Sequence, residues 1–169
     1  MELTNATVAI MGGGSWATAI VKTLTVNHRH VDWLVLNEDI RDSLATRCRN
    51  SKYLPWCYIN NEYFTVSADI NEVVRDADIV ILAMPSAFMK KFLEPLTESL
   101  KDKIVVSAVK GIIPGDYLTI VEHMNRYYDV PMDRLAVVTG PSHAEEVGQC
   151  QLSYLTVASE NIDTAEQVR

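Results

Sequence analysis

The sequence predicts an α/β fold in which a doubly wound, mainly parallel sheet is covered by helices on both faces. Short apolar runs rich in β-branched residues alternate along the chain with segments of helical periodicity. One of these runs, residues 79–83, is apolar throughout, which is typical of a strand buried on both faces. Glycine, proline and polar residues follow directly after several runs. Parallel strands bring such positions to one edge of the sheet, where ligands bind.

Composition limits the classes of partner. The 169 residues are 48% hydrophobic and 22% charged, which fits one domain with a sizeable core. A net charge of −7 disfavours nucleic acid and anionic membranes as partners. No apolar run approaches a membrane span, and the first residues lack a signal-peptide pattern. Cys48, Cys57 and Cys150 have no CxxC spacing, so we expect reduced, buried thiols in a cytoplasmic protein, with no metal site.

The first strand runs into a glycine-rich turn and then a helix. The pattern Gly12-x-Gly14-x-x-Ala17 follows an apolar run without a gap. Gly12 allows a tight turn, Gly14 lets a pyrophosphate approach the backbone, and Ala17 permits close packing of helix on strand. The free N–H groups near Ser15 and Trp16 then face the anion. The alternative is a glycine turn that only reverses the chain.

A second strand is expected at residues 31–36, followed by a helix that begins near Asn37. In dinucleotide-binding folds an acidic residue at this strand end binds the ribose hydroxyls, and an arginine suits a 2′-phosphate. Asn37 has the right spacing and no charge, while Arg41 lies a turn into the helix and is poorly placed. The alternative for Glu38 and Asp39 is that they only stabilise the start of the helix through its dipole and do not contact the ribose. We therefore expect either NAD or NADP, with no strong preference for NADP.

The remaining elements follow in alternation. Residues 50–57 are predicted to form an aromatic, turn-rich loop. Further strands are predicted at residues 64–66, 79–83, 104–108, 135–139 and 152–159. Helices are predicted to begin at Asp69, Asp116, Ser142 and Asp163, each a good N-cap residue. A further helix carries Phe88, Phe92 and Leu96 at helical spacing and is ended or broken at Pro95.

Unusual residues collect where the predicted strands end. They are the glycine loop, Asn37, Pro85-Ser86, Lys110-Gly111 and Gly140-Pro141-Ser142. This clustering predicts a binding site at the carboxyl edge of the sheet. Lys110 is the favoured functional side chain, although a lysine is more often simply solvated. His143 is a weaker candidate for a general base, because the dipole of the helix that it opens disfavours its charged form.

The order and spacing of these motifs resemble the NAD(P)-dependent glycerol-3-phosphate dehydrogenases over the whole chain. The shared pattern comprises Gly-x-Gly-x-Trp-x-Thr-Ala from Gly12, Pro85-Ser86, Lys110-Gly111 and Gly140-Pro141-Ser142-x-Ala144-x-Glu146. Ala17 stands where many members have a third glycine, and the family's usual arginine or histidine near the end of the second strand is absent. The resemblance implies a Rossmann-type cofactor domain.

The resemblance also implies roles for individual residues. It assigns cofactor contacts to Ser15, Trp16, Asn37, Tyr53, Lys110 and Ala144, and to these we add Gly12 and Gly14 from the glycine loop and Pro85 from its place at a strand end. It assigns the substrate site to Lys110, Gly140 and Ser142, with Lys110 as the catalytic residue on this part of the chain. The implied activity reduces dihydroxyacetone phosphate, a small phosphate substrate, to sn-glycerol 3-phosphate for phospholipid synthesis. The implied cofactor is NAD or NADP.

Members of this family carry a second, helical domain that supplies the catalytic lysine and the main ligands of the substrate phosphate. We expect residues 1–169 to be one dinucleotide-binding domain that ends within a helix and is inactive alone. Two alternatives are a related two-domain enzyme such as a ketopantoate reductase, and a non-catalytic dinucleotide sensor. Trp16 and Lys110-Gly111 argue against the first, and Gly140-Pro141-Ser142 against the second. A homo-oligomer is left open.

Overall fold

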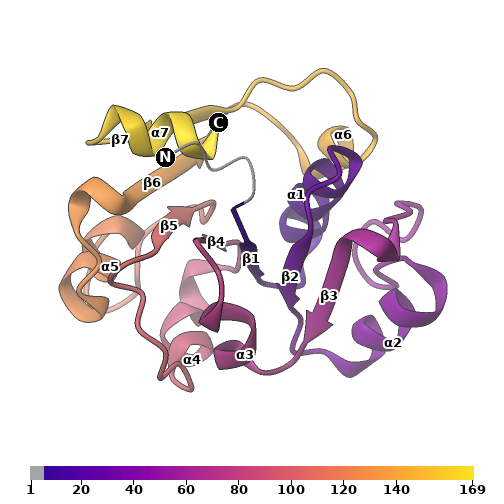
Figure 1. Ribbon diagram of the computed structural model, residues 1–169, viewed down its shortest axis with the longest axis horizontal. Coiled ribbons are helices and arrows are strands. Elements are labelled where there is room, and N and C mark those ends of the chain that lie inside the picture. The colour runs from indigo at the N-terminus through magenta and orange to yellow at the C-terminus, as the bar shows by residue number, and fades with distance from the viewer. Residues whose placement is uncertain (1–5) are drawn as a thin grey trace.

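A seven-stranded sheet runs through the centre of the structure, a computed structural model that describes residues 6–169 (Figure 1). The strands are β1 (Val8–Met11), β2 (Val31–Leu34), β3 (Phe64–Ser67), β4 (Ile79–Leu82), β5 (Ile104–Ser107), β6 (Leu135–Thr139) and β7 (Thr156–Ser159). Their order across the sheet is β3-β2-β1-β4-β5-β6-β7. All neighbours are parallel except β7, which pairs antiparallel with β6. The predicted fold class is confirmed.

Helices cover both faces of this sheet. They are α1 (Ser15–Val26), α2 (Glu38–Arg47), α3 (Ile70–Arg75), α4 (Met89–Leu93), α5 (Ile120–Tyr128), α6 (Ala144–Gly148) and α7 (Ile162–Val168). Short 3₁₀ turns occupy η1 (Asn61–Tyr63), η2 (Ser86–Phe88) and η3 (Met132–Arg134). Buried residues of α1, α2 and α6 form one core, and those of α3, α4 and α5 form the other. α1 and α6 lie side by side in Figure 1.

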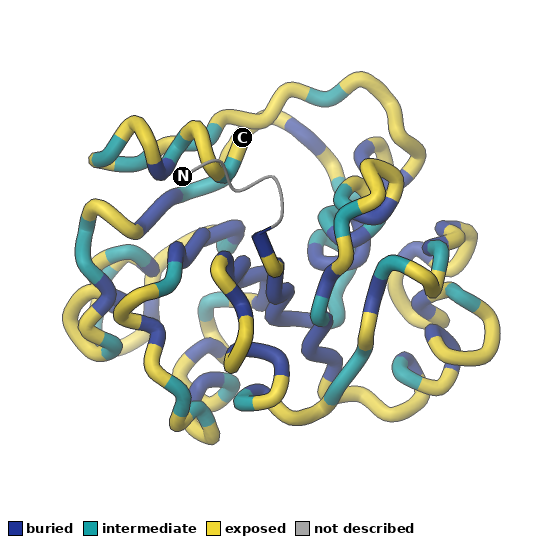
Figure 2. The backbone as a smooth tube through the Cα atoms, viewed as in Figure 1, coloured by how far each residue is buried: buried dark blue, intermediate teal, exposed yellow. Residues whose placement is uncertain are grey.

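The two cores arise from the alternation of side chains along each strand. In β1, Val8 and Ile10 join the core under α1, whereas Ala9 and Met11 join the opposite core. All four are buried, which explains the continuous apolar run in the sequence. Figure 2 shows the central strands β1, β4 and β5 as dark, buried chain, whereas the edge strands β3 and β7 and the outer helix turns are largely half-buried or exposed.

Strand register brings the functional loops to a common level. Met11 pairs with Leu34 of β2 on one side and with Leu82 of β4 on the other. Leu82 in turn pairs with Ser107 of β5. The loops after β1, β2, β4 and β5 therefore leave the sheet at one edge. From β1 the strand order runs outward to β2 and β3 on one side and to β4 and β5 on the other. Open α/β sheets form a ligand crevice where the strand order reverses in this way, here between β1 and β4.

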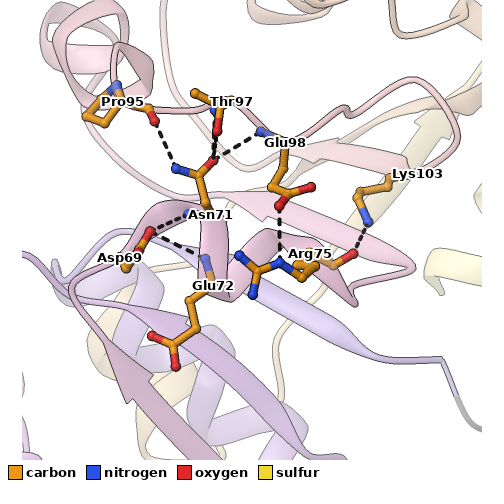
Figure 3. A network of polar contacts seen from close by, with 8 residues as sticks. All are labelled: Asp69, Asn71, Glu72, Arg75, Pro95, Thr97, Glu98 and Lys103. Atoms are coloured by element: carbon orange, nitrogen blue, oxygen red, sulfur yellow. Dashed lines mark hydrogen bonds and ion pairs between the residues drawn. The ribbon is translucent and has the colours of Figure 1, made fainter.

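A polar network ties α3 to the segment after α4 (Figure 3). Asn71 donates from Nδ2 to the carbonyl oxygen of Pro95, and its Oδ1 accepts from the N–H groups of Thr97 and Glu98. Arg75 pairs with Glu98 at 3.1 Å. These contacts fix the turn that follows Pro95, where the predicted helix ends.

The structure corrects three predicted element boundaries. The last strand begins at Thr156, since residues 152–155 form an exposed loop. β2 ends at Leu34, two residues earlier than predicted. The helix predicted to carry Phe88 begins at Met89, and Phe88 lies in a 3₁₀ turn with 63% of its surface exposed. Isolated apolar residues at helical spacing therefore overstated the length of that helix.

Three predicted N-caps are also wrong. α5 is capped by Thr119 in a reciprocal capping box with Glu122, and Asp116 pairs instead with Lys90. α7 is capped by Asn161, which accepts from the N–H of Asp163. The N-cap of α6 is His143 rather than Ser142. The prediction for α3 is confirmed, because Asp69 accepts from the N–H groups of Asn71 and Glu72.

The cysteine prediction holds only in part. Cys57 is buried, and burial raises the pKa of its thiol, but Cys150 is exposed and Cys48 is half-buried. Within residues 6–169 no group of three His, Cys, Asp or Glu side chains is arranged to hold a metal ion. Over the same residues, no helix has the length and apolar character needed to cross a bilayer.

Candidate functional site

A cavity of about 790 Å³ opens along the carboxyl ends of β1, β2, β4 and β5. It is lined by ten of the residues predicted for the site: Gly12, Gly14, Ser15, Trp16, Asn37, Tyr53, Pro85, Lys110, Ser142 and Ala144. The structure therefore brings together side chains that lie more than 120 residues apart in sequence. Of the predicted residues only Gly140 is not part of the lining. The cavity also has an apolar wall that the sequence did not single out, formed by Leu36, Ile40, Phe88 and Phe92.

The glycine loop between β1 and α1 has two different steric requirements. Gly12 has φ +132°, and a Cβ there would collide with the carbonyl oxygen of Ala83, the first residue after β4. Gly14 is different, since a Cβ built on it meets no atom within 4 Å, and its φ of −83° suits any residue. Gly12 is thus required by packing, whereas the space beside Gly14 is left for whatever occupies the cavity.

Each carbonyl oxygen of the glycine loop accepts a hydrogen bond from a side chain of the protein. The indole N–H of Trp33 donates to the Gly12 oxygen at 2.7 Å, and Asn50 Nδ2 donates to the Gly13 oxygen at 3.0 Å. The hydroxyl of Thr18 donates to the Gly14 oxygen at 2.9 Å. No side chain of the described residues caps the start of α1. The first N–H groups of a helix have no partner within it, so here they face the cavity.

Asn50 is a site residue that the sequence reasoning missed. It is fully buried, and its Nδ2 also donates to the hydroxyl oxygen of Thr18 at 2.8 Å. Its Oδ1 accepts from the N–H groups of Lys52 and Tyr53. One amide therefore joins the glycine loop to the loop that carries Tyr53. An asparagine in a turn-rich segment gives no sequence signal of such a long-range role.

The end of β2 carries more positive charge than the sequence indicated. Asn37 caps α2, with its Oδ1 accepting from the N–H of Ile40 at 3.1 Å. Arg41 folds back on this strand end, where one guanidinium nitrogen donates to the carbonyl oxygens of Val35 and Leu36 at 2.8 Å each. The charge of Arg41 thus lies beside the backbone that precedes Asn37, but Arg41 is not among the described residues that line the cavity. That it is a poorly placed phosphate partner stays a prediction.

The opposite end of the cavity is formed by the loops after β4, β5 and β6. Lys110 follows β5, and it is the one Lys or Arg side chain among the described residues that line the cavity. The loop after it is fastened to α4, because Lys90 contacts Asp116 at 2.6 Å. Beneath that pair His123 is 5% exposed at its side chain, with Nδ1 3.5 Å from Asp116. Burial lowers the pKa of His123 despite this carboxylate.

Gly140 and Ser142 contact the chain segment that returns toward β7. Gly140 has φ +146°, and a Cβ there would collide with the carbonyl oxygen of Tyr154. The Ser142 hydroxyl donates to that same oxygen at 3.2 Å. Ser142 nevertheless lines the cavity, as do His143 and Ala144. The backbone N–H of His143 donates to Glu146, so His143 opens α6 as its N-cap. Substrate contact by Gly140 and Ser142 stays a prediction.

Comparison with known families gives one match over nearly the whole chain. The model described as the NAD-dependent glycerol-3-phosphate dehydrogenase N-terminus matches residues 7–165. The chain belongs to this family. That membership decides against the ketopantoate reductases and confirms the resemblance drawn from the motifs.

Curated relatives carry the corresponding name. Glycerol-3-phosphate dehydrogenase [NAD(P)+] from Halalkalibacterium halodurans is 32% identical over 164 residues, covering 96% of this chain and 47% of the relative. The protein of that name from Halothermothrix orenii is 35% identical over 166 residues, with the same coverage. The chain thus spans about half the length of the curated relatives it matches.

Solved structures have the same fold over the same region. Glycerol-3-phosphate dehydrogenase from Coxiella burnetii superposes with a TM-score of 0.83 at 23% identity, covering 96% of this chain and 49% of that one. The Plasmodium falciparum enzyme gives a TM-score of 0.85 at 20% identity, covering 94% and 47%. At these identities the likeness concerns the fold of the sheet and its helices.

Proposed function

We propose that this chain is the cofactor-binding part of an NAD(P)-dependent glycerol-3-phosphate dehydrogenase. In this proposal the whole protein transfers a hydride between NAD(P)H and dihydroxyacetone phosphate, giving sn-glycerol 3-phosphate for phospholipid synthesis. The observation that carries the proposal is one continuous cavity that joins an uncapped glycine loop to Lys110. Family membership and the names of the relatives support it.

The cavity fits a dinucleotide in size and in chemistry. Its volume of about 790 Å³ lies within the range of small-molecule and cofactor sites. The free N–H groups at Ser15 and Trp16 would hold the pyrophosphate, because they stand at the positive end of α1. Leu36 and Phe92 supply apolar surface near the end of β2, where an adenine would pack. The proposal places the nicotinamide at the other end, toward Lys110 and Ala144.

Lys110 gives the reacting end of the cavity its positive charge. When bound, the nicotinamide supplies the hydride that adds to the ketone carbon. Negative charge then develops on the ketone oxygen and is stabilised by a nearby cation. Lys110 is available for this role, because it lies at the end of β5 on a loop that is fixed by the contact between Lys90 and Asp116. Its ammonium also attracts the phosphate of the substrate.

We further propose that these 169 residues bind cofactor without turning over substrate. A phosphate dianion and a developing alkoxide together need more than one cation and a proton donor, and Lys110 is the single Lys or Arg lining the cavity in residues 6–169. The proposal assigns the remaining groups to the other half of the relatives' length. It also retains a cytoplasmic location, which free cysteines at positions 48, 57 and 150 support.

The test combines a binding titration with a turnover assay. The 169-residue chain is titrated with NADH by fluorescence, and NADH oxidation is followed after addition of dihydroxyacetone phosphate. We expect saturable binding, no turnover, and turnover once the chain is extended to the length of its relatives. In the extended protein Lys110→Ala should lower kcat by at least about a hundredfold.

Two results would contradict the proposal. The first is absence of NADH and NADPH binding by a chain that is folded by circular dichroism. The second is an extended protein that binds cofactor but does not oxidise it with dihydroxyacetone phosphate, which is the behaviour of a sensor. Turnover by the 169 residues alone would contradict only the claim that these residues bind cofactor without turning over substrate.

A further inference from the structure

A lysine from a separate loop lies at the rim of the cavity, beside the end of β2. Lys52 reaches the end of β2 from fifteen residues beyond Asn37. Its Nζ lies 3.2 Å from Asn37 Oδ1 and 2.9 Å from Asp39 Oδ2. Asn37 and Tyr53, the residue next to Lys52, both line the cavity. The ammonium therefore stands at its rim.

Asn37 is oriented so that it offers only donors to the cavity. Its Oδ1 accepts from both the N–H of Ile40 and the ammonium of Lys52, which uses both lone pairs. The N-cap bond to Ile40 also settles which amide atom is the oxygen. In the described part of the chain Asn37 Nδ2 has no hydrogen-bond partner. This corner thus presents an amide N–H₂ and an ammonium, with the Arg41 guanidinium close behind.

Resting on the proposed cofactor role, we propose that Lys52 recognises a phosphate on the ribose 2′-oxygen of the cofactor, and that Asp39 is the counter-ion that this phosphate replaces. With NAD(H) the pair of Lys52 and Asp39 stays intact. With NADP(H) the ammonium turns from the carboxylate to the phosphate while Asn37 donates from Nδ2. Donors at one corner suit phosphate oxygens, which accept charge-assisted hydrogen bonds.

The contact between Lys52 and Asp39 is suited to such an exchange. Both side chains are well exposed, at 46% and 76%, and exposed ion pairs are weakly held. The hydrogen bond from Lys52, together with its charge, keeps the pKa of Asp39 below its usual value, so the counter-ion is charged at neutral pH. Lysine is a mobile point charge with three donors, which lets it change partner without moving the backbone.

The same arrangement limits how far NADP is favoured. Asp39 and Glu38 are both acidic and adjoin this corner, so a 2′-phosphate gains the attraction of Lys52 and meets their repulsion. Both cofactors are therefore accepted, with affinities within about tenfold of each other. This agrees with the expectation from the sequence that NADP is not strongly preferred, and it names the residues that balance the two affinities.

The experiment isolates the 2′-phosphate by comparing 5′-AMP with 2′,5′-ADP, which differ in that group alone. The chain is titrated calorimetrically with both nucleotides and with NADH and NADPH. We expect Lys52→Met to weaken 2′,5′-ADP and NADPH about tenfold while 5′-AMP and NADH change less than about twofold. Asp39→Asn should strengthen NADPH about threefold, because it frees Lys52. The control Lys101→Met makes the same charge change before β5, at the opposite edge of the sheet.

Each contrary outcome has a distinct meaning. If wild-type chain binds NADH but Lys52→Met leaves the ratio of NADPH to NADH affinity unchanged, the inference is wrong and the proposed function stands. A loss of NADPH affinity in Arg41→Met but not in Lys52→Met would transfer the role to Arg41 and overturn it equally. If wild-type chain binds neither NADH nor 5′-AMP, the proposed function itself fails. A Lys101→Met effect as large as that of Lys52→Met would reduce the result to net charge, which also overturns it.

Discussion

Asn50 offers the sharpest test of how the glycine loop is held. Asn50→Ala removes four hydrogen bonds, two donated to the Gly13 oxygen and Thr18 hydroxyl and two accepted from the N–H groups of Lys52 and Tyr53. A buried hydrogen bond contributes about 1 kcal/mol net. Lys52 and Tyr53 are exposed residues whose freed N–H groups can bind water, so the two lost donations from Asn50 leave a loss of about 2 kcal/mol in the free energy of unfolding. That is within the usual stability of a domain, so the variant stays folded.

Cofactor binding should fall as well, because the Gly13 peptide is then free to turn its carbonyl toward the cavity. We expect NADH affinity to drop about tenfold, or about 1.4 kcal/mol. The matched control is Asn71→Ala, which also removes four hydrogen bonds and lies outside the cavity lining (Figure 3). It should lower stability with less than a twofold change in NADH affinity.

The assay is urea denaturation followed by circular dichroism, paired with NADH titration below the onset of unfolding. If Asn50→Ala loses stability and binds NADH like wild type, the claim that Asn50 orients the loop is refuted. Equal losses of affinity in Asn50→Ala and Asn71→Ala would also refute it, since the effect would then follow general destabilisation.

Three further predictions address the frame around the site. Gly12→Ala should cost about 3 kcal/mol or prevent folding, measured by urea denaturation, because φ +132° and the Ala83 carbonyl exclude a side chain. Trp33→Phe keeps a buried ring but loses the bond to the Gly12 oxygen, so the free energy of unfolding should fall by about 1–2 kcal/mol. Burial lowers the pKa of His123 in the folded chain, so as the pH falls below 6.5 the unfolded chain binds this proton more readily and the free energy of unfolding decreases. His123→Leu should make this decrease smaller between pH 7 and pH 5. An unchanged dependence of stability on pH would contradict the prediction.

The fold was predictable because strand and helix signals alternate without interruption. Runs such as the fully buried β1 and β4 are apolar along their whole length, and the glycine loop sits between strand and helix as the motif requires. The sequence motifs also located ten of the cavity residues, since each motif ends a parallel strand at the same edge. Local sequence patterns are enough to predict site residues when the sheet topology alone brings the ends of the strands together.

Helix starts were less predictable, because several good N-cap residues lie close together. Asp116 and Thr119 compete for α5, and the first is drawn to Lys90, 26 residues away. Ser142 does not cap α6 for a similar reason, because its hydroxyl donates to the carbonyl oxygen of Tyr154. Tertiary contacts of this kind decide between neighbouring caps and leave no trace in local sequence.

The side chains that support the site were not predictable either. Trp33 reads as a core residue of a strand, yet its N–H holds the Gly12 oxygen. Asn50 acts on Gly13 across 37 residues, and Lys52 on Asn37 across fifteen. Each lies in a segment whose composition indicates only a buried strand or a loop. Their roles follow from contacts with oxygen atoms far away in the sequence, the Gly12 and Gly13 carbonyls and the Asn37 amide, and only the three-dimensional structure gives these contacts.

The most direct test of dinucleotide binding is the NADH affinity of Gly14→Val. The backbone there is extended, with φ −83° and ψ −178°, and a Cβ meets nothing within 4 Å, so the fold should accept valine. Its branched side chain would fill the space assigned to the pyrophosphate. We predict that NADH affinity falls at least about a hundredfold, or about 2.7 kcal/mol, with an unchanged circular dichroism spectrum and urea midpoint. Wild-type affinity in this folded variant would show that no dinucleotide lies across the glycine loop.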